Sequence, residues 1–148
     1  MTRIYTTTQI NRPIEQVYEF VTTPDHWPQW HPSSLGVTAD TDHSLVVGES
    51  CTEAFYVAWQ KGEVIWTVVD RKAPTRWVIN GRIVGRNNGG TITYTLTPQN
   101  GGTYFEREFV YPRPNILFSL LDKVIVRRRV TAESEEAVRC LKQVLAKN

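Results

Sequence analysis

The sequence has only two cysteines, Cys51 and Cys140, and three histidines among its 148 residues. Two thiols cannot build a disulfide framework or a four-cysteine zinc site. His26 and His31 lie five residues apart, and neither has a cysteine or a carboxylate at the spacing of a metal site. We therefore expect two buried, reduced thiols and neither a metal nor a cofactor.

Long apolar runs are also missing. The first eight residues lack the apolar segment of a signal peptide, and no run approaches the length of a membrane span. The net charge is only +2, so the overall electrostatics do not indicate a nucleic acid or an acidic membrane as partner. The basic run Arg127–Arg129 is followed by Glu133, Glu135 and Glu136, which is typical of a solvated helix face. These absences predict a cytoplasmic protein without nucleic-acid binding or integral membrane association.

Signature motifs of common enzyme classes are absent. The sequence contains no G-x-S-x-G, no H-E-x-x-H, no P-loop and no G-x-G-x-x-G after a predicted strand. Asn88–Gly90 is typical of a hairpin turn and not of a phosphate-binding loop. The motifs thus give no support for a serine or cysteine triad, and they leave open whether the protein is an enzyme.

Aromatic side chains are plentiful, with five Trp, six Tyr and five Phe spread over nearly every predicted element. Near the start, Ile4–Ile10 is rich in Thr and predicts a strand. Pro13 suits the first position of a helix, and an apolar face at helical spacing follows it, so we expect a helix at about 13–22. Thr23–Asp25 repeats the start signal and predicts a second short helix at about 24–30. The face of the first helix comprises Ile14, Val17, Tyr18 and Val21.

From Gly36 to Pro112 the apolar pattern changes to period two, which predicts an antiparallel meander. The expected strands are Val46–Val57, Glu63–Asp70, Arg76–Val84, Thr91–Thr97 and Thr103–Tyr111, with a weaker one at Ser34–Ala39. Turn residues separate them at Gln60–Gly62, Lys72–Pro74, Asn87–Gly90 and Pro98–Gly102.

After Pro114 the helical period returns and predicts one long helix at about 115–146. At ~1.5 Å per residue, such a helix spans ~45 Å and crosses a whole sheet. A lone sheet must cover its apolar face, and this helix is the main cover available. The whole chain, 1–148, is therefore expected to be a single α+β domain. Its six- to seven-stranded sheet curls around the helix and leaves an apolar space, the usual form of a small-molecule site.

Two groups of motifs run through the chain. The stronger group is N-terminal and comprises Ile10–Val21, Pro24, Trp27–Trp30 and Pro32. The later group comprises Val47–Glu49, Val68–Asp70 before Pro74, Thr95–Pro98 and Gly102–Thr103. Together they resemble the motifs of the polyketide cyclase/dehydrase and lipid-transport family, within the START-like, birch-pollen-allergen-like helix-grip superfamily. The resemblance covers about Ile4 to Leu145. It implies a seven-stranded antiparallel sheet that grips the C-terminal helix, with a hydrophobic ligand between them.

Alternation along the strands selects candidate ligand-binding residues. On the last strand Phe105, Arg107 and Phe109 share a side, and two phenylalanines mark that side as concave. Glu53 shares a side with Phe55 and is expected to point inward too. A buried Arg or Glu needs a partner, either each other or a polar ligand. The full set of candidates is Glu53, Phe55, Trp66, Trp77, Tyr94, Phe105, Arg107, Phe109, Phe118 and Leu121, while Trp27 and Trp30 are expected to be structural.

Three functions remain open at this point. The first is a carrier or sensor of a small hydrophobic molecule, lipid-like, polyketide or aromatic, which needs a lined cavity and no acid–base groups. The second is a polyketide cyclase or dehydratase, which could work by orienting its substrate and moving one proton, with Glu53, Arg107, Tyr94 or His31 as the groups to suspect. The third is an interaction module of the co-chaperone or toxin-like kind. The protein is expected to be a monomer or a homodimer.

Overall fold

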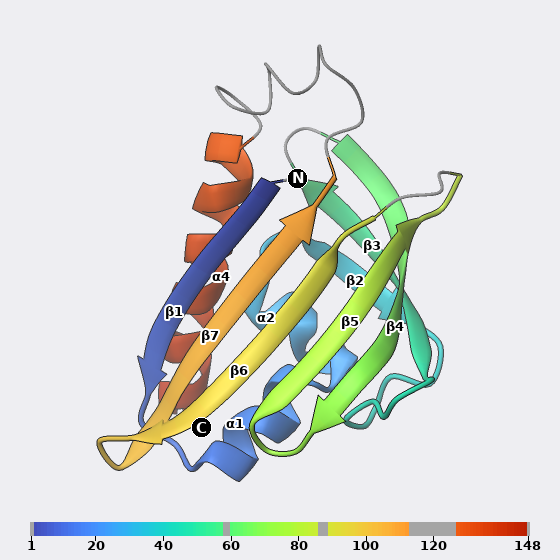
Figure 1. Ribbon diagram of the computed structural model, residues 1–148. Helices are drawn as coiled ribbons and strands as arrows, with labels where there is room; N and C mark the ends of the chain where they lie inside the picture. The colour runs from blue at the N-terminus through green and yellow to red at the C-terminus, as the bar shows by residue number, and fades with distance from the viewer. Residues whose placement is uncertain (1, 58–59, 86–88, 113–126, 148) are drawn as a thin grey trace.

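The computed structural model describes residues 2–57, 60–85, 89–112 and 127–147 (Figure 1). The elements in chain order are β1 (Thr2–Ile10), α1 (Ile14–Val21), η1 (Pro24–His26), α2 (Trp27–Trp30), β2 (Ser34–Thr38), β3 (Ser50–Val57), β4 (Gln60–Lys72), β5 (Arg76–Ile83), β6 (Thr91–Gln99), β7 (Gly102–Tyr111) and α4 (Arg127–Lys147). No helix within these ranges is long and apolar enough to cross a membrane.

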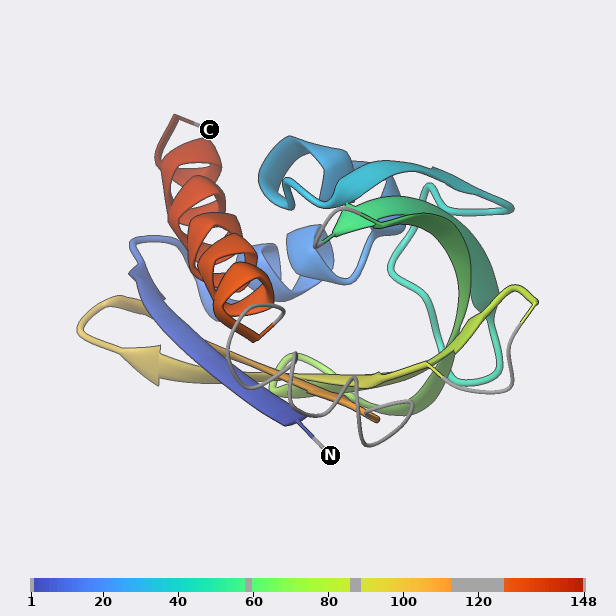
Figure 2. The same cartoon turned by 90° about the horizontal axis from the view of Figure 1, so that it is seen from above.

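All seven strands belong to one antiparallel sheet with the order β1-β7-β6-β5-β4-β3-β2. The sheet curls into a half-barrel, and α4 lies along its concave side next to β1 (Figure 2). The same helix contacts α2 and, less extensively, β3 on its other flank. The predicted helix-grip fold is therefore confirmed, with α4 packed between the edge strand β1 and the short helix α2.

The N-terminal helices follow the expected pattern with one difference. Val17, Tyr18 and Val21 of α1 are buried, as the apolar spacing predicts. The second expected helix is a 3₁₀ turn, η1, that continues as the single α-helical turn α2. Pro24 stands in the first turn of η1 and Pro28 in that of α2, where a missing N–H is tolerated.

The third strand begins later than expected, at Ser50 instead of Val46. Gly48 has φ +94°, a backbone conformation that a continuing strand does not accommodate. Val46 and Val47 are exposed, at 46% and 57% of their surface, so their apolar character misled the assignment. Residues 46–49 form a turn, closed by a hydrogen bond from the Glu49 N–H to the Val46 carbonyl.

The expected turn at Gln60–Gly62 is also wrong, because these residues open β4. Gly62 is the register partner of Phe55 in β3. The Phe55 ring lies so close over this glycine that an added Cβ would stand 2.9 Å from it. Glycine at this position makes room for an aromatic side chain of the neighbouring strand. From composition alone, the same glycine indicates a turn.

The C-terminal helix is described from Arg127 to Lys147, and its expected start near residue 115 lies outside the described residues. Its buried stripe faces the sheet and the short helices. The C-terminal end is fixed by Arg12, whose Nε donates to the Leu145 carbonyl at 2.7 Å. The stripe comprises Val130, Ser134, Ala137, Val138, Leu141 and Leu145.

Candidate ligand-binding site

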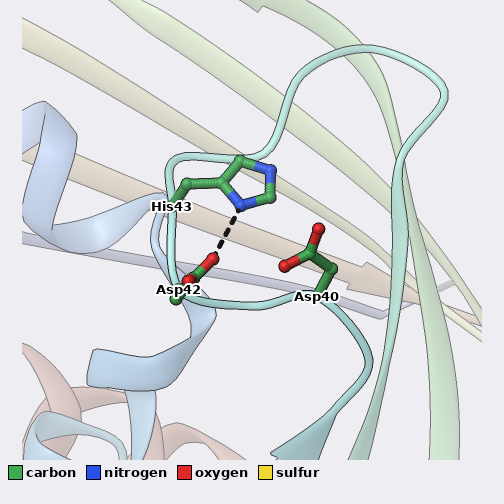
Figure 3. A group of neighbouring side chains, drawn as sticks. All are labelled: Asp40, Asp42 and His43. Carbon is green, nitrogen blue, oxygen red and sulfur yellow. Dashed lines mark hydrogen bonds and ion pairs between the residues drawn. The ribbon is translucent and has the colours of Figure 1, made fainter.

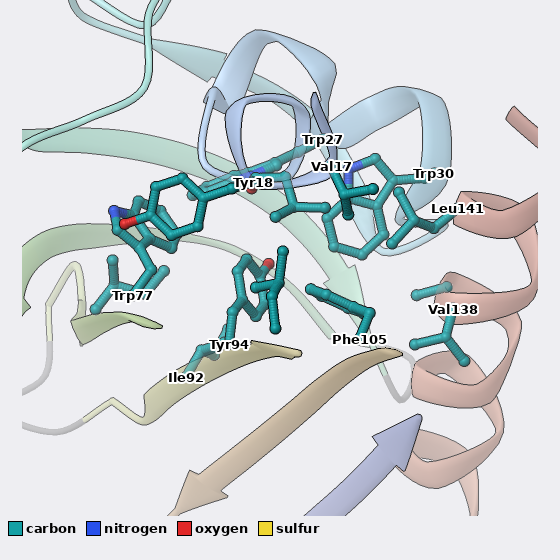
Figure 4. Close-up of a cluster of buried hydrophobic side chains, with 14 of the residues drawn as sticks. Val17, Tyr18, Trp27, Trp30, Trp77, Ile92, Tyr94, Phe105, Val138 and Leu141 are labelled. Atoms are coloured by element: carbon teal, nitrogen blue, oxygen red, sulfur yellow. The ribbon is translucent and has the colours of Figure 1, made fainter. Parts of the chain in front are cut away.

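Aromatic side chains from the sheet and the short helices meet inside the half-barrel (Figure 4). Tyr94 of β6 stacks on Trp77 of β5 with ring centroids 5.5 Å apart, and it lies 5.1 Å from Phe105 of β7. Trp30 of α2 approaches Tyr94 and Phe105 at 6.2 and 6.4 Å. Trp27 meets Trp77 edge-on at 6.2 Å. These five rings pack on one another, so Trp27 and Trp30 are part of the hydrophobic core.

The candidate residues that the structure describes all gather at this interior. Four are buried members of the core, namely Trp66, Trp77, Tyr94 and Phe105. Two are half-buried and pack against its border, namely Phe55 and Phe109. The remaining two are the charged residues Glu53 and Arg107 described below. Phe118 and Leu121 lie outside the described residues, and a role in ligand binding stays a prediction for the whole set.

Arg107 is the central charged group of the interior. Only 2% of its surface is exposed, and it lies on the concave side of β7, as alternation predicts. Its Nη1 donates to Ser134 Oγ of α4 at 3.2 Å, and its Nη2 contacts His31 Nε2 at 2.9 Å. No ion pair within 4.0 Å joins Arg107 to a carboxylate in the part of the chain that the structure describes. The guanidinium is thus held by neutral partners.

Those neutral partners are chemically unable to balance its charge. Burial, together with the adjacent Arg107 charge, lowers the pKa of His31 well below its ordinary value of 6.5. His31 is therefore uncharged at neutral pH. Burial likewise raises the pKa of Tyr94, the register partner of Arg107, to about 12. The buried cation consequently has a hydroxyl and an imidazole around it where an anion would be expected.

Glu53 approaches the same interior from β3. Its carboxylate accepts a hydrogen bond from Trp66 Nε1 at 2.9 Å. Burial raises the pKa of Glu53, while hydrogen bonds from Ser34 and Trp66 and the charge of Arg107 oppose this rise. The sequence left open whether Glu53 and Arg107 pair directly, and the structure shows no such ion pair within 4.0 Å in the described residues. The two side chains interact electrostatically at longer range on the concave side of the sheet.

Cys51 lies on the same face, two residues before Glu53, and only 2% of its surface is exposed. Burial and the nearby Glu53 charge raise the pKa of the Cys51 thiol to about 12. A thiol is nucleophilic as the thiolate, so Cys51 is an inert core side chain at neutral pH.

A cavity of about 330 Å³ opens at the surface where α4 passes the end of α2. Ser33 donates a hydrogen bond to Glu133 across this seam at 3.1 Å, and Arg129 pairs with the same carboxylate at 3.4 Å. Glu133 and Ser134 are consecutive residues of α4. Glu133 is bonded to Ser33 at the surface, and Ser134 is bonded to Arg107 in the interior. The cavity is lined by Pro32, Tyr56, Arg129, Ala132, Glu133 and Glu136.

A second group of polar side chains lies outside the half-barrel, on the loop between β2 and β3 (Figure 3). Candidate metal-ligand atoms of Asp40, Asp42 and His43 lie within 4.8 Å of one another. His43 Nδ1 contacts Asp42 at 3.2 Å, and His43 Nε2 contacts the Glu49 carboxylate at 2.9 Å. Both ring nitrogens thus have carboxylate partners, which makes the group an exposed ion-pair network around one imidazole.

The sequence could not identify two residues of the interior polar group. Ser134 is separated from Arg107 by 27 positions, and its place on the buried stripe of α4 was its only signal. His31 was considered as a metal ligand and as a possible acid or base, and nothing in its local sequence connects it to Arg107, 76 positions away.

The curled antiparallel sheet and the helix that it grips define a helix-grip domain. The sequence profile of the polyketide cyclase/dehydrase and lipid transport family matches residues 1–146, so the chain belongs to that family. No curated protein matches the chain.

Solved structures show the same fold at low sequence identity. Protein Ms6760 from Mycobacterium smegmatis is 19% identical with a TM-score of 0.72, over 98% of this chain and 91% of that one. The Aha1 dimer from Colwellia psychrerythraea is 16% identical with a TM-score of 0.67, over 98% and 96%. DynU16, a protein of the dynemicin biosynthetic locus, is 17% identical with a TM-score of 0.70 over 97% of this chain. The chain spans about half the length of DynU16, 47%.

Proposed function

We propose that the protein binds a small apolar molecule with an acidic head group, as a carrier or sensor, and that Arg107 anchors this head. The observation that carries the proposal is that Arg107 is only 2% exposed and that its described side-chain partners are all neutral. They are the hydroxyls of Ser134 and Tyr94 and the uncharged imidazole of His31. An unbalanced buried charge is costly, and an anionic ligand would offset that cost.

The surroundings of Arg107 favour an apolar ligand body. Phe109 lies under the guanidinium, with the ring centroid 5.7 Å from Cζ, and it is only half-buried. Phe55 borders the same core and is also half-buried. Partly exposed aromatic rings beside a buried polar anchor are typical of small-molecule sites, where apolar walls supply affinity and few polar groups set orientation.

Binding is better supported than catalysis. Tyr94 and Cys51 each have a pKa raised to about 12, so neither ionises readily at neutral pH. The Nε2 atom of His31 already faces Arg107, which leaves it no free lone pair for a general base. The enzyme alternative, a cyclase or dehydratase, depends on Glu53, whose burial-raised pKa suits a proton donor.

The test replaces Arg107 by Met, which keeps most of the apolar stem and removes the donors. Two probes of equal shape are compared at pH 7.4: 2-naphthoate, which is anionic, and 2-acetylnaphthalene, which is neutral. We expect Arg107→Met to weaken 2-naphthoate binding by about 1.5–3 kcal/mol, roughly 10- to 150-fold, and 2-acetylnaphthalene binding by much less. Binding constants come from calorimetry or from quenching of tryptophan fluorescence.

Arg71→Met is the matched control, because Arg71 is a partly buried arginine remote from Arg107. It lies over the Tyr18 ring at 5.5 Å and donates to Ser44 Oγ at 3.2 Å. This variant should leave both affinities unchanged. Equal losses for the two probes in Arg107→Met would mean that Arg107 supports the wall of the site without anchoring a charge.

A further inference from the structure

The contact between Arg107 and His31 fixes the proton positions of the imidazole. A guanidinium has five N–H donors and no acceptor, so His31 Nε2 must be the acceptor in the 2.9 Å contact. An imidazole that accepts through Nε2 carries its proton on Nδ1. His31 therefore presents an Nδ1–H group to its other side.

This Nδ1–H is buried and has no hydrogen-bond partner within the described ranges, and the same holds for Nε of Arg107. The two side chains are hydrogen-bonded to each other, so both donors belong to the same buried polar cluster. Buried N–H groups without acceptors are rare in native proteins, because each costs the desolvation of a polar group. Both unmatched groups are donors, so the partner that is missing here is an acceptor.

A change of pH near neutrality cannot change which nitrogen of His31 donates and which accepts. Protonation of Nε2 would place an N–H against the guanidinium, and Arg107 has no lone pair to receive it. Among the described residues, the charged group that acts on the imidazole is Arg107. Burial and the Arg107 charge also keep the pKa of His31 low.

We propose that His31 is a second anchor of the ligand head, and that Nδ1–H of His31 and Nε–H of Arg107 together select head groups that only accept hydrogen bonds. This specificity rests on the proposed function, which places the head group at Arg107. It selects carboxylates, phenolates, enolates and ketones over amides and amines, whose N–H groups would meet donors. Arg107 selects for charge, whereas His31 selects for the direction of the hydrogen bond.

Three probes of one shape separate these two effects. 2-Naphthoate is anionic and accepts only, 2-acetylnaphthalene is neutral and accepts only, and 2-naphthamide is neutral and also donates. The wild-type protein should bind the ketone about three- to tenfold more tightly than the amide, since the amide N–H₂ would be buried without an acceptor. His31→Phe should weaken the acid and the ketone alike by about three- to tenfold and narrow the gap between ketone and amide.

Two further variants distinguish a direct role from a structural one. His31→Gln keeps an acceptor for Arg107 and an N–H₂ donor for the ligand, so it should restore most of the affinity that His31→Phe loses. Ser134→Ala removes the hydroxyl that accepts from Arg107 Nη1 and leaves His31 intact. It should therefore weaken the acid more than the ketone and leave the gap between ketone and amide unchanged.

The tautomer of His31 can be measured directly, without a ligand. Long-range ¹H–¹⁵N spectra of ¹⁵N-histidine-labelled protein at pH 7 should show His31 protonated on Nδ1 only, and naphthoate should shift that resonance. Failure of the proposed function would appear as wild-type protein that binds none of the three probes. The present inference is overturned by an Nε2-protonated His31, or by wild-type binding that His31→Phe leaves unchanged.

Discussion

The indole ring of Trp66 lies directly over Gly81. The two residues are register partners on β4 and β5, and a Cβ added to Gly81 would stand 2.6 Å from a carbon of the ring. The ring cannot simply swing away, because its Nε1 is bonded to Glu53 at 2.9 Å. The absence of a side chain at Gly81 therefore sets the position of both Trp66 and the Glu53 carboxylate.

Replacing Gly81 by Ala should consequently destabilise the fold by about 1–3 kcal/mol through overpacking, and it should loosen the bond between Trp66 and Glu53. Urea denaturation followed by tryptophan fluorescence measures the free energy of unfolding. Gly62→Ala is the control, because the Phe55 ring above it is half-buried and its free end can shift. An equal or larger loss for Gly62→Ala would show that the position of Trp66 is not restricted as described.

The indole nitrogens of Trp27 and Trp30 give a second prediction. Trp27 Nε1 donates to the Val21 carbonyl at 3.0 Å, whereas Trp30 Nε1 is buried without a partner in the described residues. Both side chains are almost fully buried, so replacement by Phe removes a similar volume. Trp27→Phe also loses a hydrogen bond and leaves a carbonyl unsatisfied, so it should cost about 1 kcal/mol more than Trp30→Phe.

Thermal and urea unfolding of the two single variants measure this difference. Trp77→Phe serves as a positive control, because Trp77 Nε1 donates to the Leu45 carbonyl at 3.0 Å. It should resemble Trp27→Phe. A Trp30→Phe variant that is as unstable as the other two would reveal a partner for the Trp30 nitrogen.

The loop between β2 and β3 should make stability depend on pH. The hydrogen bond to Glu49, with that to Asp42, raises the pKa of His43 above its ordinary value of 6.5. The contribution of protonated His43 to the stability of the folded state is complete below pH 6.5, and it is lost as the pH rises through the raised pKa. The Val46 N–H and then His43 lower the pKa of Glu49 below 4.5, so its contribution is complete above pH 4.5 and is lost as the pH falls through the lowered pKa.

The two contributions overlap most fully between pH 4.5 and 6.5. Within that window the Tm of the wild-type protein should exceed that of His43→Gln by the largest margin, and the margin should shrink at higher pH. The double variant His43→Gln, Glu49→Gln should lose little more than either single one. A margin that stays constant from pH 5 to 9 would contradict an ionic role for this pair.

Much of the sheet could be predicted because the alternation of apolar and polar residues along a strand indicates which side chains are buried. Arg107 illustrates this, since its position between Phe105 and Phe109 was enough to place it on the concave side. The turn at residues 46–49 could not be predicted, because Val46 and Val47 look like strand residues while the positive φ of Gly48 ends the extended backbone. A local pattern reports which side a residue faces and says little about where a glycine bends the chain.

The sequence predicted on which face of the sheet the candidate residues lie. It did not predict which residues they contact. Glu53 and Arg107 were correctly placed inside, yet their contacts are with Trp66, Ser134 and His31. Those contacts join strands, a helix and a turn that are distant in sequence, so they depend on how far the sheet curls. Curvature arises from the twist of the strands and from shifts in register such as that between Val68 and Asp70, which composition does not reveal.

The position of α4 along the chain has a consequence for synthesis. The helix that closes the half-barrel follows every strand, so the ribosome completes the sheet before the helix exists. At about 5–20 residues per second, the 16 residues from Pro112 to Arg127 alone hold the concave aromatic face uncovered for about one to three seconds. A nascent chain halted before α4 would lack Ser134 beside Arg107 and the buried stripe of the helix, so this side of the interior would be open to chaperones or to the ligand itself.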